Sequence, residues 1–171
     1  EGPTITVTDC YEGLEGAEVS ILSGNIGITS QDDCINAANS DLSGYAFSLT
    51  IAGGTVNAYS AGGDGFDSNG DLTISGGTVA VWTASTADDQ PLDADGTLTL
   101  SGGTVLAAGG SSGMGLRITA TQPYVTFGAS AMGGAPMGGG DLTPPAAPAE
   151  GKAPALEGTR PSAPFPEGGP E

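Results

Sequence analysis

The sequence repeats one short motif of alternating residues and paired glycines, and this repetition constrains the fold more than any other feature. The motif reads Leu-Thr-Ile-Ser-Gly-Gly-Thr-Val with little variation, and three copies begin at Leu49, Leu72 and Leu98. A weaker copy begins at Val19, so the copies are 30, 23 and 26 residues apart. Alternation of apolar and polar residues indicates strands with one buried face. The glycine pair indicates a turn, because glycine bends the backbone without a Cβ clash.

A second motif lies between the copies and consists of one apolar residue flanked by acidic or small polar residues. Its members begin at Glu12, Asp33, Asp64 and Gln90, and a degraded member begins at Ser112. If the copies stack at the strand spacing of about 4.8 Å, equivalent apolar residues form continuous columns inside the stack. The predicted columns are Val19, Leu49, Leu72 and Leu98; Ile21, Ile51, Ile74 and Leu100; Ile26, Val56, Val79 and Val105; and Leu14, Ile35, Phe66, Leu92 and Met114.

This pattern predicts an all-β fold, a parallel β-helix (β-solenoid) of about five short turns within residues 1–127. Ile5 and Val7 align with Ile26 and Ile28, so the first turn begins near the N-terminus. The alternative is a β-sandwich of hairpins. Its turns would recur every ~8–12 residues, whereas the unit here spans 21–31 residues.

Composition changes after Phe127. Residues 128–171 hold nine of the twelve prolines together with runs of glycine and alanine. Such a composition favours an extended, polyproline-II-like segment rather than a packed domain. We therefore expect an extended Gly/Pro/Ala-rich tail, ordered where it packs on a neighbouring subunit.

The charge of the chain restricts its partners. Three basic residues face twenty acidic ones, which gives a net charge of -17, and there is no histidine. Such a charge repels nucleic acids and anionic lipid surfaces. No apolar run is long enough to span a bilayer. Oxygen ligands without histidine favour Ca²⁺ over zinc or copper.

A calcium site is predicted where the acidic residues of successive copies align. Residues 64–71 form the densest oxygen cluster, and the columns place Asp33 beside Asp64, Asn36 beside Asp67, and Asp67 beside Asp93. Adjacent carboxylates repel one another unless they bind a proton or a cation. A solvated acidic turn is the alternative. The candidate ligands are Asp33, Asn36, Asp64, Asp67, Asn69, Asp71, Asp89, Asp93 and Asp95.

Two aromatic residues are predicted to lie side by side on the outside of the stack. Tyr59 follows the inward-facing Ala58, and Trp82 follows the inward-facing Val81 one copy later. Aromatic rings on an outer face suit sugar binding, so Tyr59 and Trp82 are candidate glycan-binding residues. The alternative is an aromatic pair that only covers the sheet.

The repeats also resemble a known family. The Ile-Ser-Gly-Gly-Thr-Val copies, Asp-Gly-Phe-Asp-Ser-Asn-Gly at 64–70 and Tyr-Glu-Gly-Leu-Glu-Gly at 11–16 resemble bacterial carbohydrate-binding domain-containing proteins over about residues 4–120. The resemblance implies a right-handed parallel β-helix similar to pectate lyases. It also implies binding of cellulose or acidic sugars together with Ca²⁺.

The two cysteines, Cys10 and Cys34, would pair in a secreted protein and stay reduced in a cytosolic one. The alignment places Cys10 beside Gln31 and Cys34 beside Gly13, so a corner must bring the two together. A chain that starts at Glu1 rather than Met fits a processed, exported protein. We therefore expect a Cys10–Cys34 disulfide and an extracellular or cell-surface location.

Three functions remain in competition. Within the repeats Arg117 is the single basic residue, and histidine is absent, so a lyase or hydrolase is the remotest alternative and we expect no enzyme. The open ends of a short stack expose strand edges that pair with other chains. The main hypothesis is therefore a structural subunit that associates end to end into a surface or matrix filament, including an adhesive one. The alternative is a Ca²⁺-dependent module that binds polysaccharides such as cellulose or pectin.

Overall fold

The computed structural model describes residues 2–39, 41–84, 89–110 and 118–125, and every regular element in these ranges is a β-strand. No helix in this part of the chain is long and apolar enough to cross a membrane. Met114 and the predicted tail at 128–171 lie outside the described residues. The strands are β1 Thr4–Cys10, β2 Leu14–Glu15, β3 Glu18–Ile21, β4 Asn25–Ser30, β5 Ile35–Ala37, β6 Ser48–Ile51, β7 Thr55–Ser60, β8 Phe66–Ser68, β9 Asp71–Thr83, β10 Leu98–Ala108 and β11 Ile118–Ala120.

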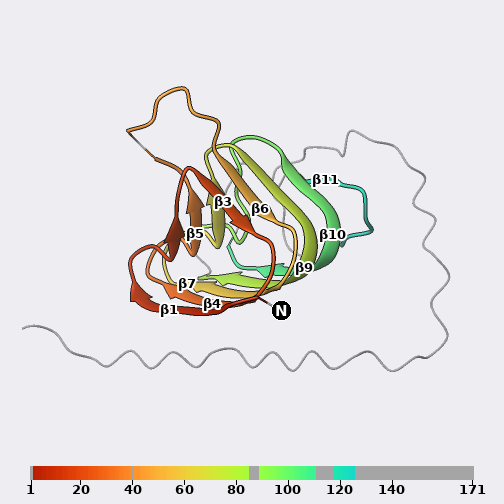
Figure 1. Ribbon diagram of the computed structural model, residues 1–171, viewed down its shortest axis with the longest axis horizontal. Coiled ribbons are helices and arrows are strands. Elements are labelled where there is room, and N and C mark those ends of the chain that lie inside the picture. Colours follow the sequence, from red (N-terminus) through yellow and green to blue (C-terminus); the bar gives the residue numbers. More distant parts are fainter. Residues whose placement is uncertain (1, 40, 85–88, 111–117, 126–171) are drawn as a thin grey trace, which may run out of the picture. The chain divides into compact units, whose positions relative to one another are not determined.

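The strands form two sheets in which every pairing is parallel. The larger sheet runs β1-β4-β7-β9-β10-β11, and β3 and β6 join it through β9. The smaller sheet runs β2-β5-β8. Neighbouring strands therefore come from successive copies of the repeat, as the ordered stacking of β4, β7 and β9 in Figure 1 shows. The all-β class and the parallel pairing predicted from the sequence are confirmed.

The register between strands matches the predicted columns. Ile21 pairs with Ile51, Ile51 with Ile74, and Ile74 with Leu100. The other columns in the larger sheet are equally regular, and Ile35 pairs with both Leu14 and Phe66 in the smaller sheet. A bridge from Phe66 to Leu92 extends that last column by one copy. Because equivalent residues lie directly beside one another, each copy buries its apolar face against its neighbours.

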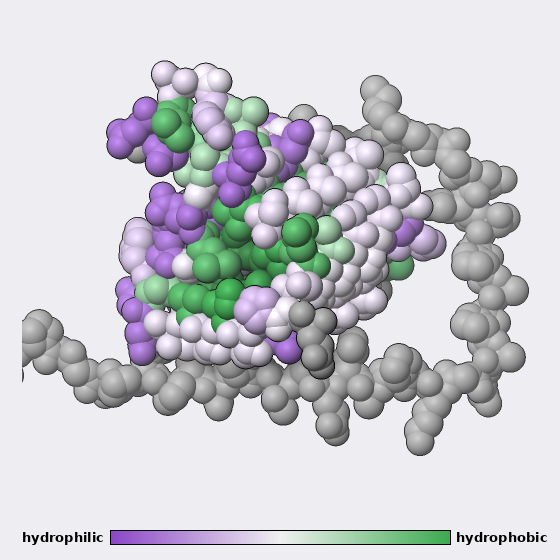
Figure 2. Space-filling model, in the orientation of Figure 1, coloured by the Kyte–Doolittle hydropathy of each residue, from purple (hydrophilic) through white to green (hydrophobic). Residues whose placement is uncertain are grey.

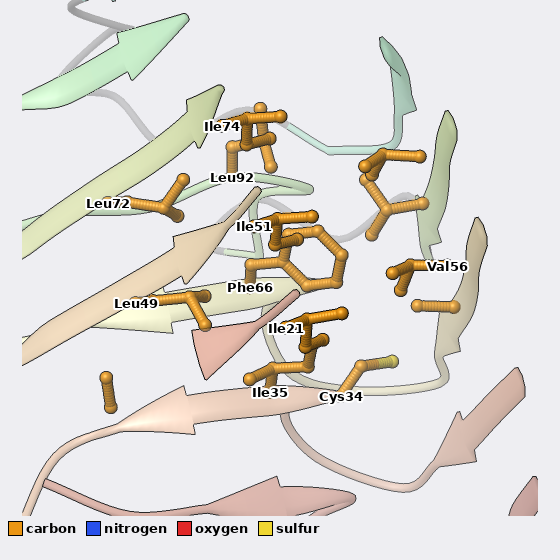
Figure 3. Close-up of a cluster of buried hydrophobic side chains, with 14 of the residues drawn as sticks. Ile21, Cys34, Ile35, Leu49, Ile51, Val56, Phe66, Leu72, Ile74 and Leu92 are labelled. Atoms are coloured by element: carbon orange, nitrogen blue, oxygen red, sulfur yellow. The ribbon is translucent and has the colours of Figure 1, made fainter. Parts of the chain in front are cut away.

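The core lies where the apolar columns of the two sheets meet. Side chains from the smaller sheet and from β6, β7 and β9 enter this space in Figure 3, where the Phe66 ring lies beside Ile51. Phe66, Ile35, Leu49 and Ile74 are fully buried. The alternating burial along β7, for example, reflects the two-residue period of a strand with one inner and one outer face.

The second glycine of each Gly-Gly pair sits in the left-handed region of backbone conformation. Gly54, Gly77 and Gly103 have φ values of 85°, 86° and 82°. A Cβ at Gly77 would also lie 2.7 Å from the carbonyl oxygen of Gly54 in the preceding copy. Both the turn and the close stacking therefore require glycine at this position.

The first strand departs from the regular pattern. The register of β1 against β4 shifts between Val7 and Cys10, and Asp9 there has a φ of 57°. This bulge inserts one extra residue. As a result Cys10 lies beside Ser30 rather than beside Gln31, and that part of the predicted alignment is wrong.

Candidate functional site

Polar side chains flank both sides of the apolar column in the smaller sheet. Backbone hydrogen bonds align Asp33, Asp64 and Gln90 in a first column. The Cys34 N–H donates to the Asp64 carbonyl, and the Gly65 N–H donates to the Gln90 carbonyl. Glu12 begins this first column, because the Gly13 N–H donates to the Asp33 carbonyl. The second column contains Glu15, Asn36, Asp67 and Asp93. In each copy the first column lies two positions before the apolar residue, and the second column lies directly after it. The two columns together form one acidic surface, which we call the acidic corner.

Three carboxylates converge within the acidic corner. Asp64 and Asp67 flank Phe66 on β8, and Asp93 follows Leu92 in the next copy. Each offers one carboxylate oxygen, and these oxygens lie within 4.8 Å of one another. All three residues are half-buried. Such a group of oxygens suits a hard divalent cation such as Ca²⁺.

Backbone and side-chain donors fix the orientation of these carboxylates. Asp33 Oδ1 accepts a hydrogen bond from the Asp64 N–H at 2.7 Å, and Asp64 Oδ1 accepts one from the Gln90 N–H. Asp93 Oδ1 accepts from Gln90 Nε2 at 3.1 Å and from the Ala94 N–H at 2.9 Å. Each aspartate of the first column therefore also links its copy to the next.

Burial and mutual repulsion raise the pKa values of the central carboxyl groups. Burial raises the pKa of Asp67 to about 7, with further contributions from the charges of Asp33 and Asp64. Burial likewise raises the pKa values of Asp33 and Asp64 to about 6. The hydrogen bond that each carboxylate accepts from a backbone N–H partly opposes this rise. The folded acidic corner therefore favours binding a proton or a cation.

An unsatisfied oxygen lies in the same column. Asn36 Oδ1 is buried without a hydrogen-bond partner, and Glu12 Oε2 is the other such side-chain atom among the described residues. Asn36 pairs directly with Asp67 in the sheet. A buried oxygen without a partner costs free energy. A protonated Asp67 or a cation beside Asn36 would remove that cost. The residues of the acidic corner therefore fit the predicted Ca²⁺.

The remaining predicted ligands take other positions. Asp71 Oδ1 accepts the Thr97 N–H at 2.8 Å, which gives it a structural role at a different turn. Asn69 is exposed, and its backbone N–H donates to the Ala37 carbonyl at 3.1 Å. The charge of Asp95 contributes to the raised pKa of Asp67, and the charge of Asp89 contributes to the raised pKa of Asp64.

The outer aromatic residues occupy adjacent strands. Tyr59 on β7 pairs with Trp82 on β9, and both are half-buried. Thr29 precedes them and Ala108 follows them in the same outward-facing column. The predicted adjacency is therefore present, on a face separate from the acidic corner.

A buried column of hydroxyl groups was not anticipated from the sequence. Ser30, Ser60 and Thr83 occupy equivalent inward positions at the ends of their strands. Ser60 Oγ donates to the Asp32 carbonyl at 2.8 Å and accepts the Gly63 N–H at 2.9 Å. These bonds satisfy the backbone that leads into the acidic corner. The alternation along each strand predicts that these positions face inward. A search for apolar residues alone misses them, because serine and threonine are polar.

Cys10 occupies the same column as these hydroxyl groups. Cys10 Sγ donates to the Thr29 carbonyl at 3.4 Å, and Cys34 Sγ lies 3.2 Å from Ser30 Oγ. Both cysteines are free thiols in the structure. Burial raises the pKa of Cys34 to about 11, so it is protonated at neutral pH. The disulfide stays a prediction, which the intact mass before and after reduction would test.

The comparison with known proteins agrees with the resemblance seen in the repeats. Residues 1–114 match the family of carbohydrate-binding domain-containing proteins. The chain belongs to this family. The matched range covers the acidic corner, both aromatic residues and all four copies of the glycine motif. No curated protein and no solved structure matches the chain. Membership of this family indicates carbohydrate binding, and the ligand and its site are proposals.

Proposed function

We propose that the chain is a non-catalytic, extracellular module that binds polysaccharide with the help of Ca²⁺. The observation that carries the proposal is the convergence of Asp64, Asp67 and Asp93 in a member of a carbohydrate-binding family. The proposal reverses the order of our two main hypotheses from the sequence, in which a filament subunit came first.

The proposed scaffold is a right-handed parallel β-helix. Parallel pairing of each copy with the next, with equivalent apolar residues side by side, supports it. The shared glycine turn supplies a corner, and the smaller sheet supplies a second face of such a coil. Successive copies then present equivalent outward positions at regular intervals, which suits a polymer made of repeating units.

Calcium would be held by the acidic corner. The ligand set that we propose contains Asp64, Asp67 and Asp93, with Asn36 Oδ1 as a neutral oxygen beside them. Ca²⁺ accepts six to eight oxygen ligands, so positions would remain for water or for a ligand. An acidic sugar would otherwise be repelled by a chain with a net charge of -17. A bridging cation therefore explains how this surface binds acidic polysaccharide.

Affinity electrophoresis in gels containing pectin or cellulose tests the proposal. We expect retardation on pectin in Ca²⁺ that is lost in chelator. It should also be lost in Asp67→Asn and in Asp93→Asn, which remove ligand charge. Asp9→Asn is the matched control, because it removes the same charge in β1, outside the three converging carboxylates, and asparagine tolerates the left-handed conformation there. Failure to bind either polymer in Ca²⁺ would refute the proposed function.

End-to-end association into a filament is the second candidate. Figure 2 shows apolar surface between the strands at the β1 and β3 end, where Ile5 is 37% exposed and Val7 and Val19 are half-buried. Strand β1 nevertheless carries features that discourage pairing. Pro3 precedes it and lacks an N–H, and the bulge at Asp9 distorts its edge. A single species near 16.5 kDa by light scattering would reject this candidate.

A further inference from the structure

One connection between strands is much longer than its counterparts. Ten residues, 38–47, join β5 to β6, whereas only Asn69 and Gly70 join β8 to β9 at the equivalent place. Figure 1 shows this connection, in orange, projecting beyond the strands. Insertions into one copy of a repeat protein are frequent sites of binding, because the regular copies keep the scaffold rigid.

The described part of this connection has a defined local structure. Asn39 Oδ1 accepts a hydrogen bond from the Asp41 N–H at 2.9 Å, and the Leu42 N–H donates to the Asn39 carbonyl at 3.2 Å. Gly44 then takes a φ of 74°, which reverses the chain at little steric cost. The turn presents Leu42, which is 42% exposed, and Tyr45, which is 48% exposed. Apolar surface is visible there beside hydrophilic residues in Figure 2.

The Tyr45 ring is positioned by two neighbours. Its centroid lies 5.8 Å from that of Phe47, with the planes inclined at 46°. Its hydroxyl donates to Glu18 Oε1 on β3 at 3.3 Å. Side chains that are already oriented lose less conformational entropy when a ligand binds. An exposed ring beside a fixed carboxylate thus offers a stacking surface and a hydrogen-bond acceptor together.

We propose that Tyr45, Phe47 and Glu18 form a second glycan-binding site that takes a neutral sugar without Ca²⁺. The ring of Tyr45 would stack on the apolar face of a pyranose, and Glu18 would accept hydrogen bonds from its hydroxyl groups. Negative sugars are disfavoured, because Glu18 and Asp41 are both acidic and the converging carboxylates of the described residues lie elsewhere, at Asp64, Asp67 and Asp93. The inference rests on the proposed carbohydrate-binding function but concerns a different surface and a different class of sugar.

Binding to hydroxyethyl cellulose, a soluble neutral polymer, tests the inference in the presence of chelator. We expect the full chain to be retarded, Tyr45→Ala to bind roughly tenfold more weakly, and Tyr45→Phe to retain most of the affinity because the ring remains. Tyr124→Ala is the matched control, since Tyr124 is similarly exposed at 52% and lies outside the connection. Unfolding curves of each variant establish that it is folded.

Three results would overturn the inference: no retardation of the wild-type chain, equal binding by Tyr45→Ala, or an equal loss in Tyr124→Ala. These outcomes are separable from failure of the proposed function. Ca²⁺-dependent binding to pectin without binding to the neutral polymer would reject only this second site. Absence of binding to both polymers would reject both proposals.

Discussion

At the scale of single residues, the acidic corner dominates the chemistry of the chain. Asp33, Asp64 and Asp67 have raised pKa values because they are partly buried beside one another. The folded state therefore binds more protons than the unfolded state between the ordinary aspartate pKa of 3.8 and the raised values of about 6 to 7. By linkage, the free energy of unfolding decreases as the pH rises through this window.

This linkage gives a measurable prediction in chelator. Raising the pH from 5 to 8 should lower Tm by on the order of 5 °C, a modest value because solvent screens these half-buried groups. Asp67→Asn should make the dependence shallower, since it removes the carboxyl group with the largest rise in pKa. Asp9→Asn removes an equal charge from β1 and serves as the control. A Tm that rises with pH in the wild-type chain would contradict the account.

At the scale of elements, the glycine turns set the distance between copies. Gly77→Ala would place a Cβ 2.7 Å from the Gly54 carbonyl oxygen at a φ of 86°, so we expect a loss of about 2 kcal/mol in the free energy of unfolding. Gly27→Ala is the control, because Gly27 lies in β4 with nothing within 4 Å of a Cβ. It should change stability by less than about 0.5 kcal/mol. Equal effects in urea titrations would show that the turn does not limit stacking.

The element scale also shows what a sequence can predict. The columns through Ile51, Phe66 and Val79 follow from the spacing of the motif, because equivalent residues stack wherever every copy has the same turn. The bulge at Asp9 does not follow, since the aligned sequence copies do not show where an extra residue enters the pairing. The buried hydroxyl column through Ser60 was missed as well, because its role depends on which backbone groups need hydrogen bonds at the corner.

Only part of the candidate site could be predicted from the sequence. The neighbours Asp67 and Asp93 could be predicted from register alone, and so could Tyr59 and Trp82. Asn69 and Asp71 are candidates only through their closeness in sequence, but Asn69 is exposed and the Asp71 carboxylate accepts the Thr97 N–H instead. Tyr45 and Phe47 lie outside the repeat, so no column contains them.

At the scale of the whole molecule, parallel copies convert a short motif into a surface with two distinct chemistries. One edge carries the acidic corner, and the outer face of the larger sheet carries Tyr59 and Trp82. The net charge of -17 makes a divalent cation the natural partner of the first edge. Family membership indicates carbohydrate as the ligand, and the Ca²⁺ that we propose would link an acidic carbohydrate to this edge.

Calorimetric titration of Ca²⁺ into the chain at pH 8, followed by titration of oligogalacturonate, tests this most directly. The account predicts saturable Ca²⁺ binding that is lost when Asp67 and Asp93 are both changed to asparagine. It also predicts oligogalacturonate binding only after Ca²⁺ has been added. Absence of Ca²⁺ binding, equal binding by the double variant, or oligogalacturonate binding that persists in chelator would contradict it.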